Sequence, residues 1–167
     1  MDQPDARPLA DDRHETPTER LDRNWAEILQ ELRVTQTGIQ ILTGFLLTVP
    51  FQQRFTELST EQRGFYLVLV LLAAVTTGIM VAPVSLHRML FRRHAKSTLV
   101  TGADRLLRVG LAFLALTVSG VVLLVFDVVT TRGAALTASL LLLAGLVAAW
   151  FVLPALLARA SRRAAGG

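Results

Sequence analysis

Charged and apolar residues are segregated along this chain of 167 residues. The first 33 residues hold nine acidic and five basic side chains, whereas Val109–Phe126 contains no charged residue. Apolar runs of about 20 residues, long enough to cross the hydrocarbon core of a bilayer as a helix, recur along the chain. The pattern predicts an all-α polytopic membrane protein with four transmembrane helices, at residues 34–51, 65–86, 106–129 and 134–157.

The segment ahead of the first span divides into a tail and a helix. Residues 1–16 combine proline and charge with little to bury, so we expect a disordered cytoplasmic tail. Thr16-Pro17-Thr18-Glu19 has the pattern of a capping box with proline at the first helical position. Helical spacing then places four apolar side chains on one face, those of Trp25, Ile28, Leu29 and Leu32. We expect this cytoplasmic amphipathic helix, residues 17–33, to continue into the first span, because no helix-breaking residue separates the two.

The basic residues predict the orientation of the chain in the membrane. Five lie in the segment up to Arg33, six between His87 and Arg108, and three in the basic tail at 158–167, against three in the other two loops. Such a bias predicts that both termini face the cytoplasm. The acidic start Met1–Asp5 is unlike a signal peptide, so we expect the first span to be retained. The preference for arginine over lysine is typical of a GC-rich bacterial genome, so we expect a bacterial plasma membrane.

Composition excludes several kinds of chemistry. The chain has no cysteine, which removes disulfides, thiolate metal sites and cysteine nucleophiles. Its three histidines lack metal-ligand spacing, and neither a phosphate-binding loop nor a pair of intramembrane carboxylates occurs. We therefore expect no catalytic residues, no metal and no cofactor. The net charge of +4 arises beside the apolar segments, where basic residues orient membrane proteins, so we expect no nucleic acid partner.

A polar stripe runs along the first span. Its members, Gln36, Gln40 and Thr43, share one helix face through their i, i+4, i+7 spacing. Because amides in hydrocarbon need partners, we expect this face to point into the bundle. The stripe is either a path for an ion or small polar ligand, or a set of hydrogen bonds that holds the helices together.

Asp127 is the one acidic residue deep in an apolar run, about 27 Å along a helix counted from Val109 and therefore near the outer interface. It is a candidate ion or proton site. The alternative is an interfacial carboxylate paired with Arg132 or Arg54.

His87 is the second candidate ion or proton site, because it titrates near neutral pH. Pro83 removes the hydrogen bond to the Ile79 carbonyl, and Thr76 shares a helix face with both Pro83 and His87. These groups form either a proton-sensitive site or a helix bend followed by an interfacial histidine.

A basic segment follows the second span. It contains four candidate contacts for anionic lipid head groups, Arg88, Arg92, Arg93 and Lys96. The same residues are also explained as a topology signal without a specific ligand.

Two stretches resemble a known family. They are Arg33–Gly38 with Gln40–Phe45 and Pro50–Gln52, and Ala82–Arg88 with Phe91-Arg92. The resemblance is to small actinobacterial membrane proteins of unknown function with four helices, over roughly residues 20–155. Some members carry a sodium:proton antiporter label. The resemblance implies the fold and supplies no mechanism.

Two functions are consistent with this sequence. The first is a non-enzymatic accessory or interaction protein that contacts membrane lipids and binds a protein partner or a second copy through the cytoplasmic helix. Its candidate partner face is Trp25, Ile28, Leu29 and Leu32. The alternative is a small ion or proton transporter that uses Asp127 and the polar stripe. A hydrated cavity that joins Asp127 to the stripe would favour the transporter.

The predicted orientation is tested by fusing a reporter that is active only outside the cytoplasm. We expect no activity for fusions after Ala165 or within Ser97–Asp104, and activity for fusions near Glu57 or Gly133. Activity in the Ser97–Asp104 fusion would contradict the orientation drawn from the basic residues.

Overall fold

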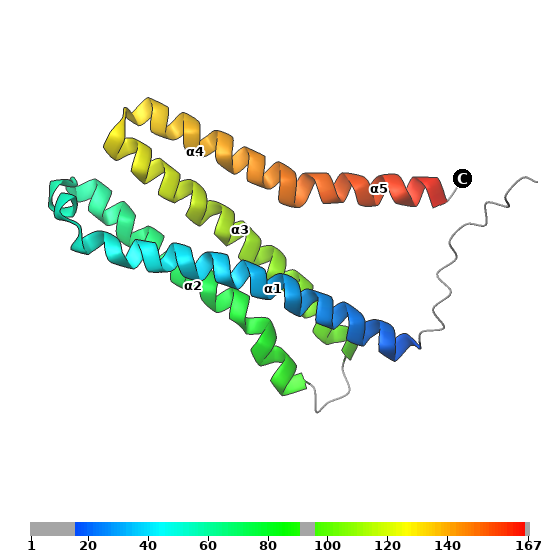
Figure 1. Ribbon diagram of the computed structural model, residues 1–167. Coiled ribbons are helices and arrows are strands. Elements are labelled where there is room, and N and C mark those ends of the chain that lie inside the picture. Colours follow the sequence, from blue (N-terminus) through cyan, green and yellow to red (C-terminus); the bar gives the residue numbers. More distant parts are fainter. Residues whose placement is uncertain (1–15, 91–95, 166–167) are drawn as a thin grey trace, which may run out of the picture.

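The computed structural model describes residues 16–90 and 96–165, and all of its regular structure is helical (Figure 1). The elements are α1 (Pro17–Thr48), η1 (Val49–Phe51), η2 (Gln53–Glu57), α2 (Thr60–Leu90), α3 (Lys96–Val129), α4 (Arg132–Val147), η4 (Ala148–Val152) and α5 (Leu153–Ala165). The start of α1 and the end of α5 lie at one end of the bundle, the terminal end (Figure 1). The connections from α1 to α2 and from α3 to α4 lie at the other end, the loop end.

Some predicted features lie outside the described residues. The expected tail at 1–16 is one, apart from Thr16. Within the helices, the side chains at 86–90 and 96–101 and at several positions of 17–28 are not described. The affected candidates are Trp25, Ile28, His87, Arg88, Arg92, Arg93 and Lys96.

α1 is one helix of 32 residues, about 48 Å long, which confirms the predicted continuity of the amphipathic segment and the first span. At its start the hydroxyl of Thr16 accepts from the Glu19 N–H, and the Glu19 carboxylate accepts from the Thr16 N–H, so the capping box is confirmed. The Thr16 N–H and then the Thr16 hydroxyl hold the pKa of Glu19 below its ordinary value. The buried line of α1 follows a seven-residue spacing through Leu32, Ile39 and Leu46.

α2 and α3 form the central antiparallel pair, and glycine lets them approach closely. A β-carbon on Gly120 would lie 2.5 Å from Cδ2 of Leu69, and one on Gly110 would lie 2.6 Å from Cε of Met80. Leu69 and Met80 are themselves fully buried. Small residues at a helix interface are the common means of close packing in membranes, where burial of apolar surface drives little association.

α1 packs against both members of this pair. Towards the loop end its contact is an apolar cluster made of Leu46, Tyr66, Leu69, Ala73 and Leu124. The Tyr66 hydroxyl donates to the carbonyl oxygen of Leu46 at 2.7 Å, so the buried phenol is satisfied. The Tyr66 ring also meets Phe55 of η2 edge to face, with ring centroids 5.3 Å apart.

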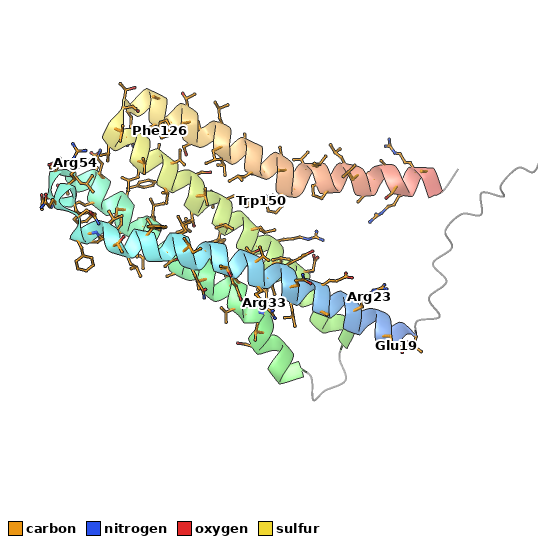
Figure 2. All side chains as sticks on the ribbon, viewed as in Figure 1. Glu19, Arg23, Arg33, Arg54, Phe126 and Trp150 are labelled. Carbon is orange, nitrogen blue, oxygen red and sulfur yellow. The ribbon has the colours of Figure 1, made fainter. Side chains whose placement is uncertain are left out.

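The fourth span is the least buried of the four. Near the loop end Ala135 is buried against the bundle, and the hydroxyl of Ser139 donates to the carbonyl oxygen of Ser119 in α3 at 2.8 Å. Beyond Ser139 no described residue of α4, η4 or α5 is buried. These elements diverge from α1 toward the terminal end (Figure 1), and the half-buried Trp150 points from their junction toward α3 (Figure 2).

Four described stretches are long and apolar enough to cross a membrane, Leu29–Phe51, Thr60–Ser85, Gly102–Val129 and Arg132–Ala164. They confirm the predicted all-α fold with four membrane-spanning helices.

Two predicted boundaries differ from the structure. α3 begins at Lys96, ten residues before the predicted start of the third span at 106, and Asp104 within this extension pairs with Arg108 one turn later at 2.8 Å. The basic tail expected at 158–167 is helical through Ala165. No proline or glycine interrupts the chain between Leu156 and Ala165, so the helix runs on past the apolar span.

The tight contact at Gly120 predicts a position-specific sensitivity to side-chain size. Gly120→Val should lower the free energy of unfolding by about 1–3 kcal/mol, because the new side chain collides with the buried Leu69. Gly145→Val is the matched control, since a β-carbon on Gly145 meets nothing within 4 Å. Unfolding in mixed micelles by added SDS, followed by circular dichroism, measures both variants. Equal stability of the two variants would contradict the packing of α2 on α3 described here.

Candidate functional site

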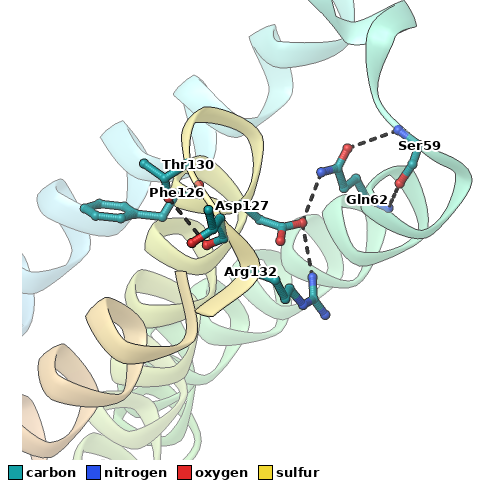
Figure 3. Close-up of polar contacts among 7 residues, drawn as sticks. Ser59, Gln62, Phe126, Asp127, Thr130 and Arg132 are labelled. Carbon is teal, nitrogen blue, oxygen red and sulfur yellow. Dashed lines mark hydrogen bonds and ion pairs between the residues drawn. The ribbon is translucent and has the colours of Figure 1, made fainter. Parts of the chain in front are cut away.

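A polar cluster at the loop end joins three helices. The Oδ2 atom of Asp127, on the last turn of α3, accepts a hydrogen bond from Nε2 of Gln62 in α2 at 3.0 Å. The same oxygen lies 3.1 Å from Nη1 of Arg132, the first residue of α4. Figure 3 shows both contacts converging on one carboxylate.

Local sequence explains how the partners of Asp127 are placed. Ser59 and Gln62, spaced as in a capping box, form one at the start of α2: the Gln62 N–H donates to the Ser59 hydroxyl at 3.2 Å, and Oε1 of Gln62 accepts from the Ser59 N–H at 3.0 Å. Its oxygen is thereby engaged, which leaves the Gln62 amide nitrogen to donate to Asp127 (Figure 3). The Thr131 side chain caps α4 and so sets the position of Arg132 at its first turn.

A recess of about 90 Å³ lies beside this carboxylate, lined by Glu61, Gln62, Phe65, Leu123, Leu124, Asp127 and Arg132. The Asp127 side chain is 12% exposed and the Arg132 side chain 66% exposed. The recess has room for a few water molecules, at about 30 Å³ each. A cation that bound Asp127 would meet the positive charge of the Arg132 guanidinium, which lies 3.1 Å from the same carboxylate. The described residues contain no group of three His, Asp or Glu side chains that could hold a metal.

Of the two partners predicted for Asp127, the structure brings Arg132 to it and not Arg54. Arg54 lies on η2 and pairs with Glu57 at 3.6 Å, with both side chains largely exposed. Gln62 was missed as a site residue. Its capping-box spacing was the available signal, but a capping glutamine has a second amide atom to use, and only the packing of α2 on α3 decides where that atom goes.

The predicted polar stripe divides into three different environments. Gln36 is half-buried, and its Nε2 donates to the carbonyl oxygen of Met80 in α2 at 3.0 Å. Thr43 is half-buried, and its hydroxyl donates within α1 to the Ile39 carbonyl oxygen at 2.7 Å. Gln40 is exposed, so the expectation that it faces the bundle is wrong. The helix turns about 100° per residue, and Gln40 directly follows the buried Ile39, which rotates it out of the contact.

The polar groups around Pro83 differ from those predicted. Pro83 lies inside α2 and is fully buried. The Thr76 hydroxyl donates to its own helix, to the Leu72 carbonyl oxygen at 2.6 Å, and does not serve the carbonyl of Ile79. The amide of Gln36 instead donates to the neighbouring carbonyl oxygen of Met80, so the polar group near Pro83 comes from α1.

A groove at the terminal end separates α1 from α3. Its volume is about 560 Å³, and its lining is Glu27, Gln30, Glu31, Val34, Thr35, Leu107 and Leu111. Leu32 is fully buried in this region and Leu29 is half-buried. The loop after the second span, residues 91–95, lies outside the described residues, and the described α3 packs near this part of α1. Leu107 and Leu111 were missed because their sequence pattern is that of an ordinary membrane span.

The fold and its polar groups define an all-α, multi-pass membrane protein. Residues 14–154 match DUF6328, a family of unknown function, and the chain belongs to this family. No curated protein and no solved structure matches the chain. The predicted resemblance to a membrane family of unknown function is confirmed to that extent, while an actinobacterial source stays a prediction.

The geometry of Asp127 predicts the effect of neutralising it. Asp127→Asn should lower the free energy of unfolding by at most about 1 kcal/mol, because its amide oxygen still accepts from Gln62 and the lost ion pair involves an exposed arginine. Asp127→Leu should cost about 1–3 kcal/mol, because Nε2 of Gln62 then lacks an acceptor. Unfolding in SDS micelles measures both, and Glu57→Gln, in the exposed pair with Arg54, is the control. Loss of cellular function in Asp127→Asn at an unchanged protein level would instead favour an ion or proton site.

Proposed function

We propose that this chain is a non-enzymatic interaction protein of a bacterial plasma membrane, which binds a protein partner at the terminal end of its bundle. The observation that carries the proposal is the open groove of about 560 Å³ between α1 and α3. The bias of basic residues places this end in the cytoplasm. The groove lies on the amphipathic half of α1, but neither Leu29 nor Leu32, the two residues of the predicted partner face whose side chains are described, lines it, and Leu32 is buried within the chain.

The chemistry of the groove selects a kind of partner. Glu27, Gln30 and Glu31 supply acidic and polar groups from α1, while Leu107 and Leu111 supply an apolar wall from α3. Glu27 is largely exposed, and its distance of 3.9 Å from Arg23 makes that ion pair a loose one. An amphipathic helix with leucines on one face and arginines or lysines on the other fits such a surface.

α5 has this same chemistry. Its leucines at 153, 156 and 157 are largely exposed, and three arginines follow in its second half, of which Arg162 lies opposite the leucines and Arg159 and Arg163 flank them. α5 diverges from α1 and α3 at the terminal end (Figure 1). A peptide of α5 is therefore a suitable probe for the groove. The α5 helix of the chain itself could compete with this peptide, so the test has to include a variant without that competition.

The transporter draws less support from the described residues. Asp127 is already engaged by Gln62 and Arg132 at the loop end. Between Gln62 and Met80 of α2, where Gln36 binds, the buried residues are Tyr66, Leu69, Ala73 and Thr76. The hydroxyls of Tyr66 and Thr76 both donate to backbone carbonyls. The buried residues of α2 between Gln62 and Met80 therefore do not form a series of free polar groups that could bind an ion.

A binding experiment with the full-length protein tests the groove. The probe is a labelled peptide of residues 153–165, and the protein is embedded in nanodiscs of neutral phosphatidylcholine to suppress binding to lipid. Fluorescence anisotropy should show binding that weakens several-fold in the Glu27→Gln, Glu31→Gln double variant, since each exposed ion pair contributes up to about 1 kcal/mol. The matched control is Glu57→Gln with Glu61→Gln at the loop end, which should leave the affinity unchanged.

Competition by α5 itself is removed in a second variant, with Arg159, Arg162 and Arg163 all changed to Gln. This variant should bind the peptide at least as tightly as the natural chain. The proposal fails if the triple variant does not bind the peptide, or if the affinity is the same with and without Glu27 and Glu31.

A further inference from the structure

One polar side chain of the first span, that of Gln40, has no hydrogen-bond partner within the described chain. Gln40 lies inside the first span, about 9 Å from its predicted cytoplasmic end at residue 34 and about 16 Å from Phe51 at 1.5 Å per residue. It is exposed, and it makes no hydrogen bond to any residue whose side chain the structure describes. A glutamine side chain is too short to reach a head group from this depth, so its amide faces hydrocarbon, where an unpaired polar group is costly.

The neighbouring polar residues of α1 do not share this problem. Gln36, one turn earlier, donates to the Met80 carbonyl oxygen of α2. Thr37 and Thr48, exposed on the same side as Gln40, donate to carbonyl oxygens of their own helix at 3.0 Å and 2.7 Å. Gly44, one turn after Gln40, is exposed, and a β-carbon there would meet nothing within 4 Å. The outward face of α1 thus combines one unsatisfied amide with small residues that permit close approach.

The other spans lack such a group on their outward faces. Near the middle of α2 the exposed residues are apolar or glycine, namely Leu71, Ala74, Val75 and Gly78. In α3 and α4 the described span residues include no asparagine or glutamine. α4 packs on α3, and none of the helices described at 16–90 and 96–165 covers Gln40, which is exposed.

We propose that α1 of a second copy of this chain covers this face, with the two Gln40 amides hydrogen-bonded to each other. An amide carries both a donor and an acceptor, so two glutamines related by a twofold axis along the membrane normal satisfy one another. Insertion with the same topology puts residue 40 of both copies at the same depth. A lipid has no polar atom at this depth, and an unrelated helix would need its own polar residue at the same level. Gly44 lets the two backbones approach.

Cysteine cross-linking tests this interface directly, because the chain has no cysteine of its own. Gln40→Cys and Gly44→Cys, each in the full-length protein in native membranes, should give a covalent dimer of twice the monomer mass on oxidation. The matched controls are Leu71→Cys on α2 and Leu141→Cys on α4, whose side chains are 67% and 70% exposed. They should give little dimer. Dimer formation at 40 and 44 no greater than at the controls, or cross-links to a protein of different mass, would overturn the proposal.

A second measurement keeps cysteine chemistry out of the test. Energy transfer between labelled copies, diluted in phosphatidylcholine vesicles, reports the dissociation constant of the dimer. Gln40→Leu should weaken the dimer roughly three- to tenfold, as expected for loss of an interhelical hydrogen bond, while Gln40→Asn should retain most of it. Unfolding in SDS micelles should be the same for both variants, since Gln40 has no partner in its own chain. A dimer that is unchanged or tighter in Gln40→Leu would contradict the inference.

This dimer is independent of the groove between α1 and α3. Glu27→Gln with Glu31→Gln should abolish neither the cross-link at Gln40 nor the energy transfer. The two proposals can therefore fail separately.

Discussion

Hydrocarbon offers no hydrogen-bond partner, and this constraint governs the polar residues of the whole bundle. Three helix contacts are each closed by a side chain that donates to a backbone carbonyl of the neighbouring helix: Gln36 to Met80, Tyr66 to Leu46, and Ser139 to Ser119. A carbonyl oxygen has two lone pairs, so it can accept such a bond without giving up its place in the helix. These three side chains are thereby satisfied, whereas Pro83 interrupts the backbone hydrogen bonds of α2 and the buried Ser119 hydroxyl has no partner among the described residues. The three interhelical bonds also fix the register in which the helices meet.

The helices of the bundle are not packed equally tightly. α2 and α3 are held close by Gly110 and Gly120, and α1 adds its line of Leu32, Ile39 and Leu46. α4 also packs along α3, with Ala135 and Ser139 buried near the loop end and Leu142 and Leu146 half-buried beyond them. The fourth span therefore opens gradually toward α5, whose described side chains are exposed.

The charged residues divide by location in a way that bears on function. Asp127 lies at the loop end, where its contacts with Gln62 and Arg132 connect α3 to α2 and α4. Glu27 and Glu31 line an open groove at the other end. An engaged carboxylate stabilises the helix ends it joins, whereas exposed carboxylates beside apolar walls remain free to select a basic ligand. This difference is the basis for proposing the terminal end as the partner-binding end.

The sequence by itself determined the number of spans, the continuity of α1 and the two capping boxes, because hydrophobic length, helical period and caps are local properties. It also offered Arg132 and Arg54 as possible partners of Asp127, and the structure shows the pair with Arg132, five residues away. Tertiary structure alone decided which members of the polar stripe face inward. Gln36 meets α2 and Gln40 does not, because the axis of contact follows Ile39 and its heptad partners rather than the glutamines. The groove between α1 and α3 likewise joins residues some 80 positions apart, and their approach depends on how three helices cross.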